Sequence, residues 1–114
     1  MTTVVNLKKE TYDVYIGREG HGKDGYFGNS HPIGKPCYRM TCSDPTHPSG
    51  RIIHDRDSAI AAYKEDFEAR IQRDAYFLLR VLELRDKKLG CFCKPDNCHG
   101  DVIKEWLDKH PNLK

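Results

Sequence analysis

Residues 89–111 limit the folds open to this chain more than any other part of the sequence. The apolar run 89–93, Leu-Gly-Cys-Phe-Cys, predicts a buried strand, and the four residues after it predict a tight turn. An apolar stripe then predicts a helix that begins within residues 98–101 and ends before Pro111. Strand, tight turn and helix form half of a βαβ unit, which favours an α/β fold.

The earlier part of the chain supplies the other predicted elements. Residues 4–7 and 13–16 are rich in β-branched and aromatic side chains and predict strands. Between residues 57 and 82, apolar side chains recur every three or four positions, which predicts one long helix, or two that break within 72–74, with Asp57 as the N-cap. We therefore expect one domain over residues 1–114. It should hold a small open, mainly parallel, Rossmann-like sheet with packed helices and a long Gly/Pro-rich loop within residues 17–50.

Composition narrows the function classes. Charged residues make up 32% of the chain, but the formal net charge is only +2, so overall charge gives little support to nucleic-acid binding. No apolar run is long enough to span a membrane, and the N-terminus lacks the layout of a signal peptide. We expect a cytoplasmic protein with no membrane partner. Its five cysteines should be reduced thiols.

The segment 90–101 carries the densest chemistry and has more than one interpretation. If Asn97 caps the last helix, the residues after it lie at a helix start, where unpaired amides favour an anion and lower a thiol pKa. Cys98 would then be a nucleophile, His99 a proton shuttle and Asp101 a second acid or base, while Gly100 would allow a ligand to approach closely.

A metal site is the alternative interpretation of the same segment. Three sulfurs and one imidazole suit tetrahedral zinc, although the spacing is not a common zinc pattern. A purely structural role is a further alternative, because a free cysteine such as Cys91 often fills core space. The zinc ligands would be Cys91, Cys93, Cys98 and His99.

The second predicted strand leads into a glycine-rich segment. Gly17 and Arg18 follow that strand, and Gly28 and Asn29 come shortly after. Arginine at the carboxyl edge of a sheet can pair with an anion, and glycines let backbone amides approach a phosphate. We predict that these four residues bind the ligand together with Gly100.

A second, looser ligand set lies in the insert that follows the glycine-rich segment. Its spacing, C-x4-C-x4-H-x6-H, is a weak indication of metal binding, and the insert could instead act as a lid. The set is Cys37, Cys42, His47 and His54.

Several of these motifs together resemble a known family. They are the run 14–18, the pair 28–29, the Ala-Ile-x-x-Tyr pattern at 59–63, the pair 84–85 and the run 89–102 with its Cys-x-Cys-x4-Cys-His-Gly-Asp motif. Over roughly residues 4 to 107 the chain is similar to the domain-of-unknown-function family numbered four-three-two-six. Ser30 stands where members of that family usually carry proline, and the insert at 41–50 is longer than is typical. The resemblance implies a small bacteriophage or bacterial intracellular protein, located in the host cytoplasm if phage-encoded, and supplies no reaction.

Two functions follow from these patterns as expectations. The first is binding of a nucleotide or another phosphate-bearing small molecule at the strand ends, with processing of that ligand left open. The alternative is a non-catalytic, zinc-stabilised module that binds nucleic acid or a protein, such as a phage inhibitor of a host factor. The cofactor is unknown, with zinc as a candidate.

Overall fold

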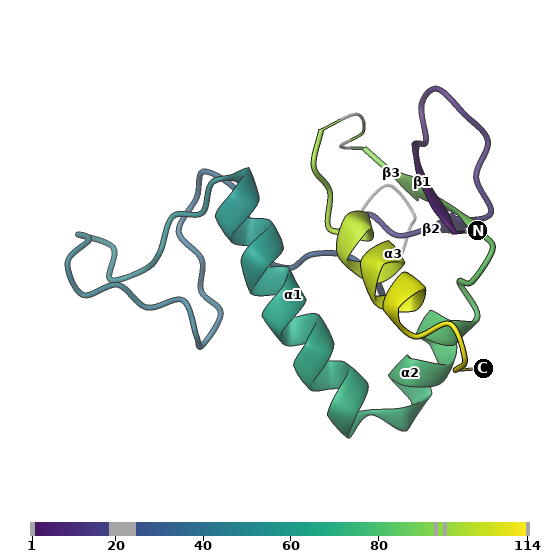
Figure 1. Ribbon diagram of the computed structural model, residues 1–114. Helices are drawn as coiled ribbons and strands as arrows, with labels where there is room; N and C mark the ends of the chain where they lie inside the picture. Colours follow the sequence, from purple (N-terminus) through teal and green to yellow (C-terminus); the bar gives the residue numbers. More distant parts are fainter. Residues whose placement is uncertain (1, 19–24, 93, 95, 114) are drawn as a thin grey trace.

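The computed structural model describes residues 2–18, 25–92, 94 and 96–113 (Figure 1). The elements in chain order are β1 (Thr3–Asn6), β2 (Val14–Tyr15), α1 (Arg56–Arg73), α2 (Ala75–Leu82), β3 (Lys88–Cys91) and α3 (Gly100–Lys109). Helices and a small sheet in one chain confirm the α/β class. All three strands begin or end within a few residues of the predicted bounds, although Cys93, predicted as the end of the last strand, lies outside the described residues.

The three strands of the described sheet are parallel, in the order β1–β3–β2. Gly90 of β3 is in register with Val5 of β1 and with Tyr15 of β2. The buried residues of β3 explain its nearly continuous apolar run, because a central parallel strand is covered on both faces. The open parallel sheet is as predicted. However, the last strand lies at the centre, and this order differs from that of the doubly wound nucleotide-binding folds.

Aspartates mark the helix boundaries. Asp55, not the predicted Asp57, is the N-cap of α1, and its side chain accepts a hydrogen bond from the backbone N–H of Ser58. Asp74 ends α1 and also caps α2 through the backbone N–H of Phe77. Of the two alternatives that the sequence left open, one long helix or two that break within 72–74, the structure has the second. The N-cap was misplaced because two aspartates precede the first apolar residue of the stripe, and both are good caps.

An aromatic core joins α1, α2 and α3. The ring centroids of Phe67 (α1) and Trp106 (α3) lie 6.2 Å apart, and those of Phe67 and Phe77 (α2) lie 5.6 Å apart. The first turn of α3 contacts the sheet so closely that a Cβ atom at Gly100 would be 2.6 Å from Cδ1 of Ile16. A glycine is therefore needed here for packing, and it brings the start of α3 against the end of β2.

The chain between β2 and α1 is irregular where it is described, apart from two isolated antiparallel bridges, Pro36↔Ile53 and Ser43↔Arg51. We call residues 31–54 the lobe. In Figure 1 the lobe lies beside α1, on the side away from the sheet. Among the described helices, none combines the length and the apolar character needed to cross a membrane.

Candidate ligand pocket and histidine–cysteine cluster

A pocket of about 290 Å³ opens where the carboxyl ends of β2 and β3 meet the beginnings of α1 and α3. Open α/β sheets bind ligands at this edge, and the volume is near the lower limit of small-molecule sites. The structure brings most of the predicted ligand residues to it, although their roles stay predictions. Those that line the pocket are Gly17, Arg18, Asn29, Cys98 and His99.

Three of the predicted site residues lie outside the pocket wall. Gly28 packs against the chain at Gly17, where a Cβ atom would be 2.5 Å from the Gly17 carbonyl oxygen. Gly100 faces the sheet instead of a ligand, as described above. Asp101 lies in the first turn of α3 and is held in an ion pair, 2.5 Å long, with Nζ of Lys94.

Arg18 is held in place by the backbone of the segment that follows it. Its guanidinium donates to the carbonyl oxygen of Asn29 and, at 2.7 Å, to that of His31. The Arg18 carbonyl in turn accepts from the hydroxyl of Tyr15 at 2.6 Å. Arg18 therefore has a structural task at the pocket rim in addition to the anion pairing that the sequence predicts.

Arg56 is a pocket residue that the sequence analysis missed. It is the first residue of α1, and its guanidinium donates to the carbonyl oxygen of Asn97 at 3.4 Å. A basic residue at a helix start gives no local signal of ligand binding. Only the packing of α1 beside the turn before α3 brings this charge to the same pocket as Arg18.

His99 is buried at the back of the pocket. Its Nε2 atom is 2.5 Å from the carbonyl oxygen of Ile16, and its ring lies edge-on to Tyr63 with centroids 5.0 Å apart. A carbonyl only accepts, so Nε2 carries the proton and Nδ1 is left unprotonated. Burial lowers the pKa of His99 below its usual value, which outweighs the opposing effect of the Ile16 carbonyl. The imidazole is therefore neutral at pH 7.

The start of α3 differs from the predicted anion site. The N-cap position is occupied by His99 without a side-chain cap bond, and Asn97 does not cap the helix. Three amides of this turn already have partners within the protein: Cys98 N–H donates to Asp101, Gly100 N–H to the Cys98 sulfur, and Asp101 N–H to the Cys98 carbonyl. These three amides are therefore not free to bind an anion as the sequence predicted.

Cys91 and Cys98 form a disulfide, which differs from the expectation of reduced thiols. Cys91 ends β3 and Cys98 precedes α3, so the bond closes the turn between them. Cys91, Cys98 and His99 do lie within 4.8 Å of one another, but a sulfur in a disulfide is neither a thiolate nucleophile nor a zinc ligand. Cys93, the remaining member of the predicted zinc set, lies outside the described residues.

A second histidine–cysteine cluster lies inside the lobe. Its four potential ligand atoms are all within 4.8 Å of one another, and all four residues are buried. The sequence pattern predicted three of these residues, Cys37, Cys42 and His54, but gave His47 as the fourth. His47 is instead exposed and interacts with the hydroxyl of Ser49, while the fourth position is taken by His31, from before the first cysteine. The cluster is therefore His31, Cys37, Cys42 and His54.

Burial sets the protonation preferences in this cluster. Desolvation and the neighbouring Cys37 raise the pKa of the Cys42 thiol above its usual value, and desolvation lowers that of His54. Without a metal ion, both shifts favour the neutral forms, which are the Cys42 thiol and the neutral His54 imidazole. A bound dication would reverse the preference for the thiols, because it stabilises thiolate ligands. The cluster can therefore hold a metal ion.

The comparisons with known proteins agree with the resemblance found in the sequence. The family described as "Domain of unknown function (DUF4326)" matches residues 4–109, and the chain belongs to that family. It is also 41% identical over 60 residues to the protein of Enterobacteria phage T4 described as "Uncharacterized 12.4 kDa protein in nrdA-td intergenic region". The aligned stretch covers 53% of this chain and 56% of the phage protein, so the chain spans little more than half the length of that relative. No solved structure matches this chain.

Proposed function

We propose that the protein binds a small phosphate-bearing molecule of nucleotide size in the pocket at the strand ends. The observation that carries this proposal is the charge of the pocket wall. Arg18 and Arg56 both line it, and among the described residues that line it there is neither aspartate nor glutamate. Arginine pairs with phosphate through two parallel hydrogen bonds, so two arginines on one small pocket favour such a ligand.

The remaining walls suit the rest of a nucleotide. Tyr15 and Phe92 lie at the pocket with their rings edge to face, 6.3 Å between centroids, and Phe92 is 49% exposed. Ile33 and Ile60 add apolar surface. An exposed aromatic face beside apolar side chains can stack on a planar base, a contact that tolerates different bases.

The geometry favours binding over catalysis. Cys98 forms a disulfide with Cys91. Asp101 lies outside the pocket wall, where its carboxylate pairs with Lys94 and accepts a hydrogen bond from the backbone N–H of Cys98. His99 is neutral and already donates to Ile16. A free nucleophile and a free acid–base pair are therefore absent from the described side chains at this site, and the proposal is one of recognition.

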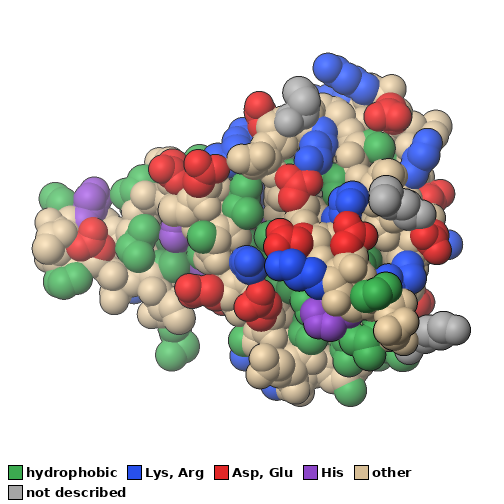
Figure 2. Space-filling model, in the orientation of Figure 1, with side chains coloured by type: hydrophobic (Ala, Val, Ile, Leu, Met, Phe, Trp, Pro, Cys, Tyr) green, Lys and Arg blue, Asp and Glu red, His purple; other side chains and the backbone are tan. Residues whose placement is uncertain are grey.

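Opposite charges are mixed on the face of the molecule that Figure 2 shows, where blue and red side chains alternate over the helices. A protein that binds a nucleic-acid backbone needs a continuous basic stripe. The lack of one on this face gives the nucleic-acid alternative no support there. We therefore place the anion in the pocket.

The test is thermal stabilisation of the full chain by AMP, ADP, ATP, pyrophosphate and inorganic phosphate, each compared with adenosine. A ligand at about 100 times its dissociation constant stabilises the folded state by about 2.7 kcal/mol, which is a readily measured rise in Tm. We expect the nucleotides to raise Tm and adenosine to have a smaller effect.

Matched variants locate the site. Arg56→Gln removes a guanidinium from the pocket and should reduce the nucleotide-dependent rise in Tm, whereas Arg73→Gln removes an exposed guanidinium from the other end of the same helix and should leave it unchanged. The proposal is wrong if none of the phosphate-bearing probes stabilises the protein. It is also wrong if both variants respond as the unsubstituted chain does.

A further inference from the structure

We propose that four buried side chains of the lobe bind a zinc ion, and that this ion replaces a hydrophobic core there: His31, Cys37, Cys42 and His54. None of these four residues lines the pocket, and the inference does not depend on the function proposed for the pocket.

The distances within the cluster fit tetrahedral zinc. The Cys42 sulfur is 3.4 Å from Nδ1 of His31 and 3.3 Å from Nε2 of His54, and the Cys37 sulfur is 3.3 Å from the same Nδ1 atom. Zinc at about 2.3 Å from sulfur and about 2.0–2.1 Å from nitrogen places the two kinds of ligand atom roughly 3.5 Å apart. The ligand atoms are therefore already spaced for the ion.

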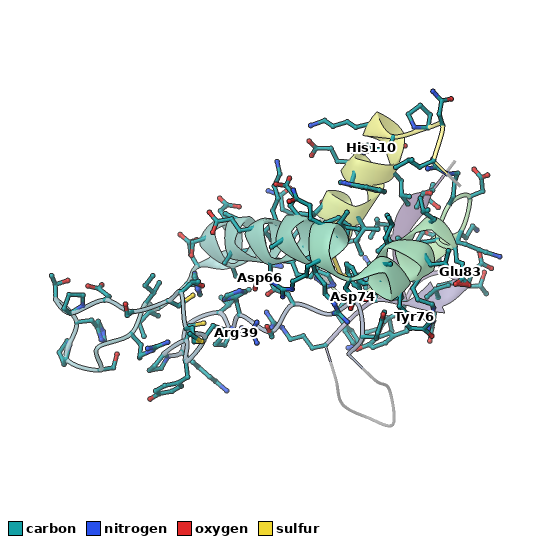
Figure 3. The ribbon with its side chains drawn as sticks, turned by 90° about the horizontal axis from the view of Figure 1, so that it is seen from below. Arg39, Asp66, Asp74, Tyr76, Glu83 and His110 are labelled. Atoms are coloured by element: carbon teal, nitrogen blue, oxygen red, sulfur yellow. A yellow bond between two sulfur atoms is a disulfide. The ribbon has the colours of Figure 1, made fainter. Side chains whose placement is uncertain are left out.

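The outer nitrogen of each histidine is anchored. Nε2 of His31 is 2.6 Å from a carboxylate oxygen of Asp66, and Nδ1 of His54 is 2.7 Å from the hydroxyl of Ser58. Figure 3 shows Asp66 on α1, beside the part of the lobe that carries Arg39, whose guanidinium lies 3.8 Å from the same carboxylate. Such anchoring of the outer ring nitrogen is the rule for histidines that bind metals.

The Asp66 contact also fixes where the proton of His31 lies. A carboxylate accepts, so Nε2 of His31 is the protonated nitrogen, and in the neutral ring Nδ1 then presents a lone pair toward both sulfurs. This is the orientation that a metal ligand requires. Both cysteines are free of disulfides, so both sulfurs are available to a metal ion.

The burial pattern of the lobe gives an independent reason to propose a zinc ion there. Every residue from 31 to 54 is described, and the only buried ones are the four of the cluster, which are 0% to 5% exposed. The large apolar side chains point outward: Tyr38 is 77% exposed and Met40 is 96% exposed. A segment of this length, with two isolated bridges and only two cysteines and two histidines buried, needs another source of stability, and a structural zinc ion supplies it in small domains.

The donor set selects zinc among the common metals. Two sulfurs and two imidazoles in a closed, buried arrangement are typical of structural zinc, whereas calcium and magnesium require oxygen ligands. Two thiolates also cancel the charge of a dication, so the loaded site is neutral and can remain buried.

The site connects to the pocket through one residue. The backbone carbonyl of His31 accepts the hydrogen bond from Arg18 at the pocket rim. A metal that fixes His31 therefore also fixes this support of Arg18. The link between the metal and ligand binding rests on the function proposed for the pocket, whereas the metal experiment does not depend on that function.

The experiment measures metal in the full chain by elemental analysis after purification, and records the visible spectrum when Co²⁺ is added to metal-free protein. We expect about one zinc ion per chain. Cobalt should give the intense visible bands of a tetrahedral site together with a sulfur charge-transfer band in the near ultraviolet. The cobalt spectrum needs no substitution, so it tests the proposal even if a variant fails to fold.

Two pairs of variants assign the ligands. His31→Ala should lose the metal and His47→Ala, the histidine that the sequence pattern favoured, should keep it. Likewise, the double variant Cys37→Ser, Cys42→Ser should lose the metal and Cys98→Ser should keep it. Helix content by circular dichroism should persist in the lobe variants, because none of their substituted residues belongs to the hydrophobic core that the helices share.

Three outcomes would overturn the assignment. The first is a chain that binds neither zinc nor cobalt in stoichiometric amounts. The second is full metal retention in the Cys37→Ser, Cys42→Ser double variant. The third is loss of metal from His47→Ala or Cys98→Ser with His31→Ala unaffected, which would move the metal to another cluster.

Discussion

Replacing Asn29 with alanine should destabilise the protein markedly, because this one side chain joins three parts of the fold. Asn29 is buried, its amide donates to the carbonyl oxygen of Ala59 in α1 at 2.9 Å, and its carbonyl oxygen accepts from the backbone N–H of His31 at 2.9 Å. The alanine variant loses both hydrogen bonds and leaves the buried His31 N–H without this acceptor.

The magnitude follows from these contacts. A net hydrogen bond contributes about 1 kcal/mol, and a buried donor left without a partner costs about 1–3 kcal/mol, so Asn29→Ala should lower the free energy of unfolding by roughly 2–4 kcal/mol. For a chain of 114 residues the unfolding entropy is about 0.24 kcal/mol per kelvin, so a loss of about 3 kcal/mol lowers Tm by about 12 °C.

The assay is urea denaturation monitored by circular dichroism, with Asn97→Ala as the matched control. Asn97 lines the same pocket but is exposed, and only its backbone carbonyl takes part in a hydrogen bond among those of the described residues. Its replacement should change the free energy of unfolding by less than about 0.5 kcal/mol. If Asn29→Ala costs less than about 1 kcal/mol, or if both variants lose equally, Asn29 does not join the segments as argued.

Two further predictions concern the start of α3. Gly100→Ala should cost about 1–3 kcal/mol in urea denaturation, because its new methyl group would meet Val4 of β1 and Ile16, which follows β2. An unchanged midpoint would show that α3 does not pack there. His99 has a folded-state pKa below its unfolded value of about 6.5, so the unfolded chain binds the proton first and stability is lost as pH falls below about 6.5 toward the folded pKa. His99→Gln keeps a donor for the Ile16 carbonyl but does not titrate, so the free energy of unfolding of the variant should fall less steeply with decreasing pH than that of the unsubstituted chain, by at most about 1.4 kcal/mol per pH unit. The lowered pKa of His54 affects the variant and the unsubstituted chain alike. Equal slopes for the two proteins would contradict the prediction.

Local patterns determined much of the fold. The recurrence of apolar residues every three or four positions marked α1 and α2 and gave a break within 72–74 as one of two alternatives, because helix periodicity acts over a few residues. The parallel sheet followed from strand, turn and helix in sequence. The carboxyl ends of parallel strands share one edge, and for this reason the sequence could also predict that Arg18 and His99 lie at one pocket.

The sequence could not determine which residues that are far apart in the chain come into contact. His31 and His47 are both near the two lobe cysteines in sequence, and only the path of an irregular segment decides that His31 faces them. Arg56 reaches the pocket because α1 packs beside the turn before α3. Local propensity acts within a few residues of an element, whereas these contacts depend on how whole segments pack together, and tertiary structure alone decides that.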